Sequence, residues 1–195
     1  MERKQIQEQR IKGYFIQAAK ELLKGEGLKR VSVRIVADRA GYSYATLYNY
    51  FKNLNDLIFE CIKEFQAECE EHVKAKTKKS PDGEQKIKDI VKAYVSYFTE
   101  YPGVFELFFL ERMGDLCNKK EISELIYHSL DSLCNEQWDY LVAEGKLTAN
   151  EAESKKQLLR FAITGLLVFY ENRLQPNTYK EFTKLLDAQL DSILG

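Results

Sequence analysis

The chain has 195 residues, of which 45% are hydrophobic and 30% are charged. This composition excludes a disordered, collagen-like or low-complexity protein, and the length suffices for one or two domains with a sizeable core. The formal net charge of −1 argues against a polyanionic partner. That sum conceals a split, because residues 1–55 carry +6 and the remainder carries −7. A basic head on an acidic body therefore permits a polyanion to bind the head.

Helical periodicity runs through almost the whole chain, and we predict an all-α fold of about nine helices with no internal repeat. Glycines, N-capping residues and two Pro-containing breaks separate the segments, and polar residues 78–83 form the clearest linker. The second helix begins at an N-cap on Ser32 and the third at one on Ser43. The expected helices cover roughly residues 4–24, 33–40, 44–50, 54–76, 84–100, 104–113, 121–144, 148–173 and 178–194.

The segment from Ser32 to Phe51 indicates a function. Small Ala37 and Ala40 and a turn at Gly41 allow two short helices to approach closely. This pattern is typical of a helix-turn-helix, which presents its second helix to the DNA major groove. From the geometry alone, a helical hairpin within a bundle is the alternative.

The predicted outer face of the second short helix favours DNA. It carries hydroxyl and small apolar groups, which suit phosphate oxygens and thymine methyl groups, in place of the Glu/Lys mixture of an ordinary solvated helix. Arg34 points the same way, and the helix N-terminus at Ser43 offers N–H groups to phosphate. The outward residues are Tyr44, Ala45, Thr46, Tyr48 and Asn49.

Residues 32–37 (SVRIVA), 40–43 (AGYS) and 46–51 (TLYNYF) resemble the DNA-binding signature of TetR-family transcriptional regulators. The similarity covers roughly residues 10–62. The chain departs from the family at two positions, since the family usually has a polar residue at the position of Ile35 and a lysine at the position of Leu54. The family's lysine contacts phosphate, and we expect Lys52 to make that contact in its place. The resemblance implies phosphate contacts from Ser32, Thr46, Tyr48 and Tyr50, and base or groove contacts from Arg34, Tyr44 and Ala45.

The acidic body carries no catalytic motif and no Gly-rich phosphate loop, so we expect no enzyme. Its aromatic side chains either fill the core or line an apolar small-molecule pocket, and the resemblance implies an effector domain. The candidate pocket residues are Phe65, Tyr94, Phe98, Phe105, Phe108, Phe109, Met113 and Tyr127.

The late segment 161–170 is apolar on all sides, which requires burial on every face. It is either the central core helix of the monomer or, together with the last helix, a homodimer interface, as the resemblance also implies. The predicted interface residues are Phe161, Ala162, Gly165, Leu166, Phe169, Phe182, Leu186 and Gln189.

The sequence predicts no membrane span and no metal or other cofactor. The apolar run 161–170 is about half of what a bilayer crossing requires, and the polar N-terminus predicts no signal peptide, so we expect a cytoplasmic protein. His72 and His128 lie far apart and no CxxC pair is present, which excludes the ligand spacing of a zinc site. We expect reduced, partly buried thiols at Cys61, Cys69, Cys117 and Cys134.

These expectations combine into a two-domain DNA-binding regulator. Residues 1–53 form the helix-turn-helix domain, a connecting helix covers about 54–76, and residues 77–195 form the effector-binding and dimerisation domain. We expect a homodimeric, ligand-responsive repressor of a palindromic double-stranded DNA operator, with an apolar or aromatic effector. The alternative is a helical interaction module whose basic head binds an acidic protein.

Overall fold

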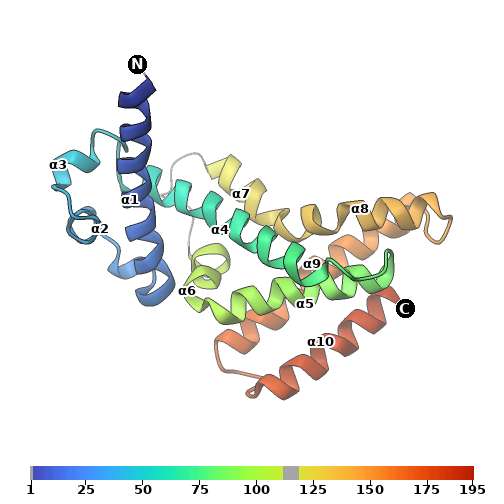
Figure 1. The fold of residues 1–195 in the computed structure, drawn as a ribbon. Coiled ribbons are helices and arrows are strands. Elements are labelled where there is room, and N and C mark those ends of the chain that lie inside the picture. The colour runs from blue at the N-terminus through green and yellow to red at the C-terminus, as the bar shows by residue number, and fades with distance from the viewer. Residues whose placement is uncertain (1, 112–118) are drawn as a thin grey trace. The chain divides into compact units, whose positions relative to one another are not determined.

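The computed structural model describes residues 2–111 and 119–195, and every regular element in these two stretches is helical (Figure 1). They contain ten α-helices, a 3-10 turn and a π-helical segment, which confirms the predicted all-α fold. The chain divides into two compact units. One consists of Met1–Ala67 and Tyr101–Ile126, and the other of Glu68–Glu100 and Tyr127–Gly195. The predicted domain boundaries at residues 53 and 77 stay a prediction.

The first unit contains the short helices of the head. Helix α1 packs against α2, and α2 against α3, as Figure 1 shows. Apolar side chains such as Phe15, Val36 and Leu47 are buried among these helices, and Lys12 of α1 forms an ion pair with Glu60 of α4. The elements are α1 (Glu2–Glu26), the 3-10 turn Leu28–Arg30, α2 (Val33–Ala40), α3 (Tyr44–Leu47), the start of α4 (Leu54–Thr77), α6 (Pro102–Phe105), the π-helical segment Glu106–Leu110 and most of α7 (Lys119–Tyr127).

Gly103 allows α6 to begin directly against the end of α1. A Cβ atom at Gly103 would lie 2.2 Å from the carbonyl oxygen of Leu23, a distance that no real contact tolerates. Pro102 occupies the first turn of α6, where its missing N–H costs no hydrogen bond. The predicted Tyr-Pro-Gly interruption therefore marks a close approach of two helices as well as a break.

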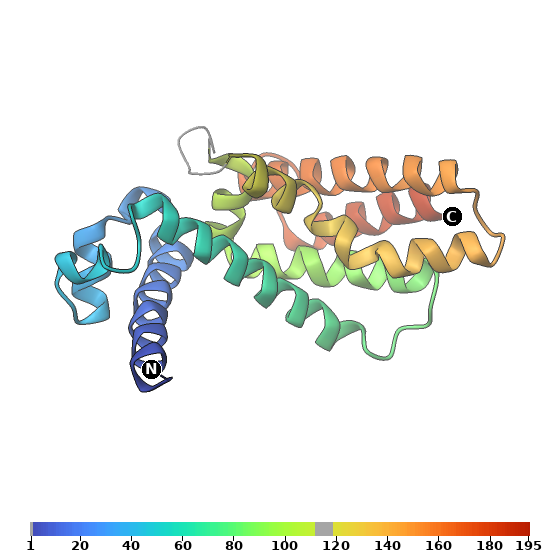
Figure 2. The ribbon, with the colours of Figure 1, turned by 90° about the horizontal axis from the view of Figure 1, so that it is seen from above.

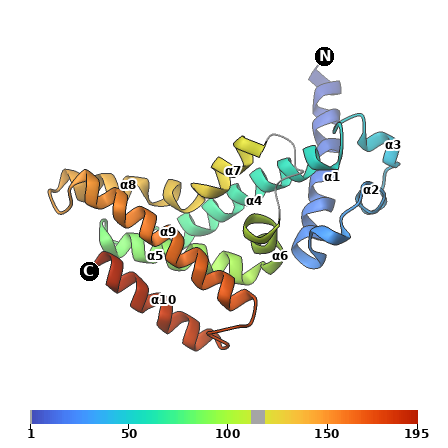
Figure 3. The same ribbon diagram turned by 180° about the vertical axis from the view of Figure 1, so that it is seen from behind.

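The second unit is a bundle of four long helices with the end of α4. Figure 2 shows α5, α8, α9 and α10 running side by side, and Figure 3 shows α9 next to α10. The fully buried side chains of its core include Trp138, Phe98 and Phe182. The helices are α5 (Glu84–Glu100), α8 (Ser129–Ala143), α9 (Ala149–Glu171) and α10 (Tyr179–Leu194).

Three predicted helices were wrong in extent. The third helix was expected to reach residue 50, but α3 ends at Leu47 and continues as a turn. The helix expected over residues 104–113 is divided into α6 and the π-helical segment, and Glu111 is already extended. The helix expected over residues 121–144 is interrupted at His128, which lies between α7 and α8.

A buried ion pair lies within one turn of the interruption at His128. The guanidinium of Arg160 donates through Nε and Nη2 to the carboxylate of Asp131, and both side chains are buried. His128 Nδ1 lies 3.0 Å from the same carboxylate, and Tyr127 lies under the guanidinium at 4.0 Å. These contacts connect the first turn of α8 to α9.

The described cysteines are enclosed. Cys61, Cys69 and Cys134 are buried free thiols, as expected, and Cys117 lies outside the described residues. Burial raises the pKa of Cys61 and of Cys69 to about 12, which disfavours the reactive thiolate. Within residues 2–111 and 119–195, no helix is long and apolar enough to cross a membrane.

Candidate nucleic-acid interface

Local capping fixes both short helices of the helix-turn-helix. Ser32 Oγ accepts from Ile35 N at 3.3 Å and starts α2. Gly41 ends α2 in the left-handed conformation with φ of 76°, which favours glycine. Ser43 Oγ accepts from Thr46 N at 3.1 Å and starts α3. The predicted turn and both predicted N-caps are confirmed.

A single buried aromatic residue of α1 holds the α3 region in position. The ring of Phe15 is fully buried and lies 5.4 Å from Tyr42, 6.1 Å from Tyr50 and 6.5 Å from Phe51, measured between ring centroids. These three contacts lie before and after α3. Together with buried Leu47, they fix a helix of only four residues against the body of the unit.

The outer face of α3 is open to solvent. Tyr44, the first residue of α3, and Tyr48, which directly follows its last residue, are 57% and 52% exposed, and Ala45 is exposed between them. Exposed Arg34 and Tyr44 line the same shallow hollow of about 430 Å³ between α2 and α3. Large aromatic side chains that project from a short helix without burying their rings are suited to contact with another molecule.

Four of the predicted contact residues also have internal roles. The hydroxyls of Ser32 and Ser43 serve as caps, and Thr46 Oγ1 lies 2.9 Å from Ser43 Oγ. Tyr50 is half-buried because its ring packs against Phe15. Since Ser43 Oγ already accepts from Thr46 N, one N–H group expected to face phosphate is used within the cap.

Lys52 has the exposure that the predicted phosphate contact requires. Its side chain is exposed, and within the described parts of the chain its ammonium has no hydrogen bond or ion pair. Its backbone N–H donates to Asp56 Oδ2 at 3.1 Å, while Asn53 Oδ1 accepts from Asp56 N at 2.9 Å and begins α4. Leu54 is half-buried. The substitution of Lys52 for a lysine at position 54 stays a prediction.

Internal ion pairs reduce the positive charge that the head offers to a partner. Lys12 lies 3.5 Å from Glu60, and buried Lys20 lies 3.5 Å from Glu64. Arg39 pairs with Glu26 at 3.2 Å, and the +6 already counts both of these charges. The charge of residues 1–55 therefore overstates the local attraction, which rests on exposed cations such as Arg34 and Lys52.

The first turns of α1 add polar residues that the motif did not reveal. Gln5 and Gln9 line an open hollow together with Asn49 and Tyr50, at the end of the turn that follows α3. The sequence predicted the α1 helix. It did not predict that the first turns of α1 lie next to the turn after α3, because that arrangement depends on tertiary packing. The only indication of these residues in the sequence was the polar character of the first turns of that helix.

The predicted pocket residues belong to two units. Phe65, Phe105 and Phe108 are buried in the first unit, where Phe109 is half-buried and lies 5.2 Å from Phe105. Tyr94 and Phe98 are buried in the second unit, and Tyr127 is 47% exposed. Met113 lies outside the described residues. A pocket formed by this set stays a prediction.

The predicted dimer residues separate into a surface group and a core group. Phe161 and Phe169 are 62% and 54% exposed on α9, and Gln189 is exposed on α10. Phe182 and Leu186 are buried in the core of the unit, where Phe182 stacks on a tyrosine of α9, and their assignment to the interface stays a prediction. The three remaining predicted residues of α9 are half-buried, namely Ala162, Gly165 and Leu166.

Comparisons with known proteins agree with this geometry. Residues 15–61 match the family described as "Bacterial regulatory proteins, tetR family". The structure is similar to the fatty acid degradation regulator FadR of Bacillus halodurans, with 19% identity, 94% of each chain covered and a TM-score of 0.71. It is also similar to FadR of Bacillus subtilis in complex with stearoyl-CoA, with 17% identity, 93% of this chain and 97% of that chain covered, and a TM-score of 0.69.

A TetR family transcription regulator from Marinobacter aquaeolei VT8 shares 17% identity over 97% of each chain, with a TM-score of 0.63. No curated protein sequence matches this chain. At such identities the structural likeness establishes the fold, while the match over residues 15–61 covers the helix-turn-helix itself. Residues 15–61 therefore match the helix-turn-helix domain of the tetR family, and the chain as a whole shares its fold with the TetR-family regulators named here.

Proposed function

We propose that the protein is a ligand-responsive transcriptional repressor that binds a palindromic DNA operator as a homodimer. The observation that carries the proposal is the open face of α3 and of the residue that follows its last turn, where Tyr44, Ala45 and Tyr48 are exposed within a basic segment. Tyrosine hydroxyls donate to phosphate oxygens, and a small side chain allows close approach to base edges. Arg34 and Lys52 supply positive charge at the two ends of the motif.

The exposed apolar face of the last two helices supports a dimer. Phe161 and Phe169 on α9 and Leu185 on α10 are each more than two-fifths exposed. Exposed aromatic side chains grouped on long helices are typical of a protein interface. A two-fold dimer presents two copies of α3, so its operator has two related half-sites.

An apolar small molecule is the proposed effector. The many aromatic residues of both units support a ligand with an apolar part, as does the complex of FadR from Bacillus subtilis with stearoyl-CoA. A ligand that binds more tightly to the conformation with low DNA affinity shifts the population toward that conformation. Ligand binding then releases the operator.

DNA binding with increasing salt tests this function. We expect tight binding to DNA from upstream of the protein's own gene, weaker binding to a scrambled duplex, and a steep loss of affinity as salt increases. The alternative of a module that binds an acidic protein predicts equal, weak binding to both duplexes. That result, obtained with dimeric, folded protein, would overturn the proposal.

A further inference from the structure

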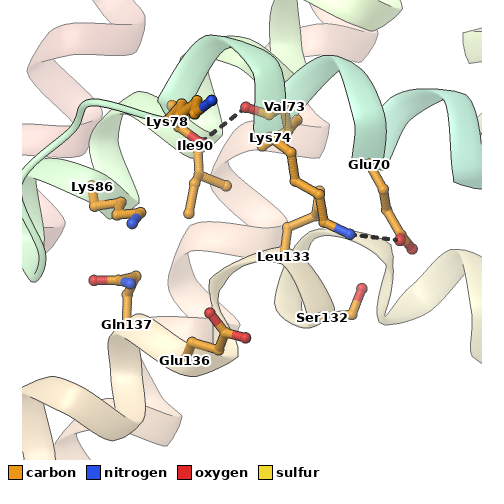
Figure 4. A pocket seen from close by; sticks show the side chains of 11 residues that line it. Glu70, Val73, Lys74, Lys78, Lys86, Ile90, Ser132, Leu133, Glu136 and Gln137 are labelled. Atoms are coloured by element: carbon orange, nitrogen blue, oxygen red, sulfur yellow. Dashed lines mark hydrogen bonds and ion pairs between the residues drawn. The ribbon is translucent and has the colours of Figure 1, made fainter.

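The second unit contains a cavity for which DNA binding has no use. It has a volume of about 430 Å³ and lies between the end of α4, the start of α5 and the middle of α8 (Figure 4). All of these segments belong to the second unit. The volume is within the range of small-molecule sites, and several lining residues are charged.

The floor of the cavity is apolar. Val73 and Ile90 are buried, and Leu133 is half-buried. Figure 4 shows Ile90, from α5, and Leu133, from α8, in the space between α4 and α8. This floor can accept methylene groups but offers no hydrogen bond to a polar ligand.

The uncharged polar groups of the lining are already satisfied. Gln137 Oε1 accepts from Gly83 N at 2.8 Å, and Gln137 Nε2 donates to Asp82 Oδ1 at 3.1 Å. The hydroxyls of Thr77 and Ser132 each donate to a backbone carbonyl at 2.9 Å. Recognition of a ligand therefore falls to the charged groups.

Three of the five charged lining residues have partners in the protein. Lys74 lies 3.8 Å from Glu70, and Lys86 lies 3.2 Å from Asp82. In each pair the positive and the negative charge compensate each other. They leave the ammonium of Lys78 and the carboxylate of Glu136 as the groups to be matched.

Lys78 and Glu136 line the same cavity without pairing. Neither side chain has a hydrogen bond or an ion pair with any residue in 2–111 or 119–195. Lys78 follows the end of α4 and Glu136 lies on α8, and Figure 4 draws them on different sides of the apolar floor. Two opposite charges are thus held apart over an apolar surface.

We propose that this cavity binds a small zwitterion, with an anionic group at Lys78, a cationic group at Glu136 and an apolar middle over Ile90 and Leu133. One exposed charge contact improves affinity by only up to about fivefold. Two such contacts made by one molecule combine, because the second group is held near its partner once the first has bound. A ligand with a single charge can pair with Lys78 or with Glu136, but not with both.

A series of ω-amino acids tests the proposal on the full chain. Binding of 4-aminobutanoate, 6-aminohexanoate and 8-aminooctanoate is measured by calorimetry or NMR, with hexanoate and hexylamine as singly charged controls. We expect at least one amino acid to bind about three- to fivefold more tightly than both controls. If all five compounds bind equally, or none of the amino acids binds at millimolar concentration, the proposal is wrong.

Matched variants locate the binding site. Lys78→Gln and Glu136→Gln should each weaken binding of the preferred amino acid about three- to fivefold. The controls are Lys79→Gln and Asp139→Asn, which remove exposed charges outside the lining and should leave affinity unchanged. If the test and control variants weaken binding equally, the loss of affinity is a general effect of charge and the proposed binding site is wrong. The experiment contains no DNA, so its failure leaves the proposed function untouched.

Discussion

Tyr48 and Tyr50 are two residues apart, yet their surroundings predict opposite consequences of replacement by alanine. Tyr48 is 52% exposed, whereas Tyr50 is half-buried with its ring centroid 6.1 Å from that of Phe15. We expect Tyr48→Ala to lower operator affinity at unchanged stability. We expect Tyr50→Ala to lower the melting temperature.

The magnitudes follow from the contacts. A hydrogen bond from Tyr48 to a phosphate contributes about 1.5–3 kcal/mol, so its loss weakens DNA binding about tenfold or more. An exposed substitution changes the free energy of unfolding by at most about 0.5 kcal/mol. Tyr50→Ala loses an aromatic contact and part of a buried ring, together about 2–3 kcal/mol, which corresponds to about 4–12 °C in a chain of this size.

Fluorescence anisotropy with an operator duplex and calorimetry at one fixed protein concentration measure the two effects separately. Tyr48→Phe is the matched control, since it removes only the hydroxyl and should reproduce most of the loss of DNA affinity. A melting temperature that falls as far for Tyr48→Ala as for Tyr50→Ala would refute the assignment of Tyr48 to the DNA-facing surface.

Three further changes test other parts of the structure. Gly103→Ala forces a Cβ against a backbone carbonyl of α1 and should cost about 3 kcal/mol in a thermal melt, whereas Gly13→Ala, with open space around it, should not destabilise. Phe161→Glu should convert the dimer to monomers in sedimentation analysis, and an unchanged dimer would contradict the proposed interface. Burial and the charge of Lys76 lower the pKa of His72, so protonation favours the unfolded state. Stability should therefore fall as pH decreases below about 6.5, less so in His72→Gln, as measured by urea melts from pH 5 to 8.

Helix starts could be predicted where their chemistry is local. Ser32, Thr148 and Thr178 each accept a hydrogen bond from the backbone N–H three residues later, so the signal lies within four consecutive residues. The interruption at His128 could not be predicted this way. The contacts next to it include the pair of Asp131 with Arg160, which is 29 residues distant in the sequence.

The same distinction applies to the candidate interface. The outward orientation of Tyr44 and Tyr48 follows from helical periodicity, which the sequence contains. The partial burial of Tyr50 depends on Phe15, which belongs to another helix. The sequence named Phe161 as an interface residue, but an apolar run on all sides does not reveal which of its sides the neighbouring helices cover.

The shortness of α3 has a consequence for the dynamics of DNA recognition. A helix of four residues has no stability of its own in water, because forming the first turn is unfavourable. It persists here through one serine cap and the anchorage of buried Leu47. Its amide hydrogens should exchange with solvent through local opening, well before those of α1. Operator binding should slow this exchange. The exchange rate of the α3 amides should therefore measure the fraction of protein that is bound to DNA.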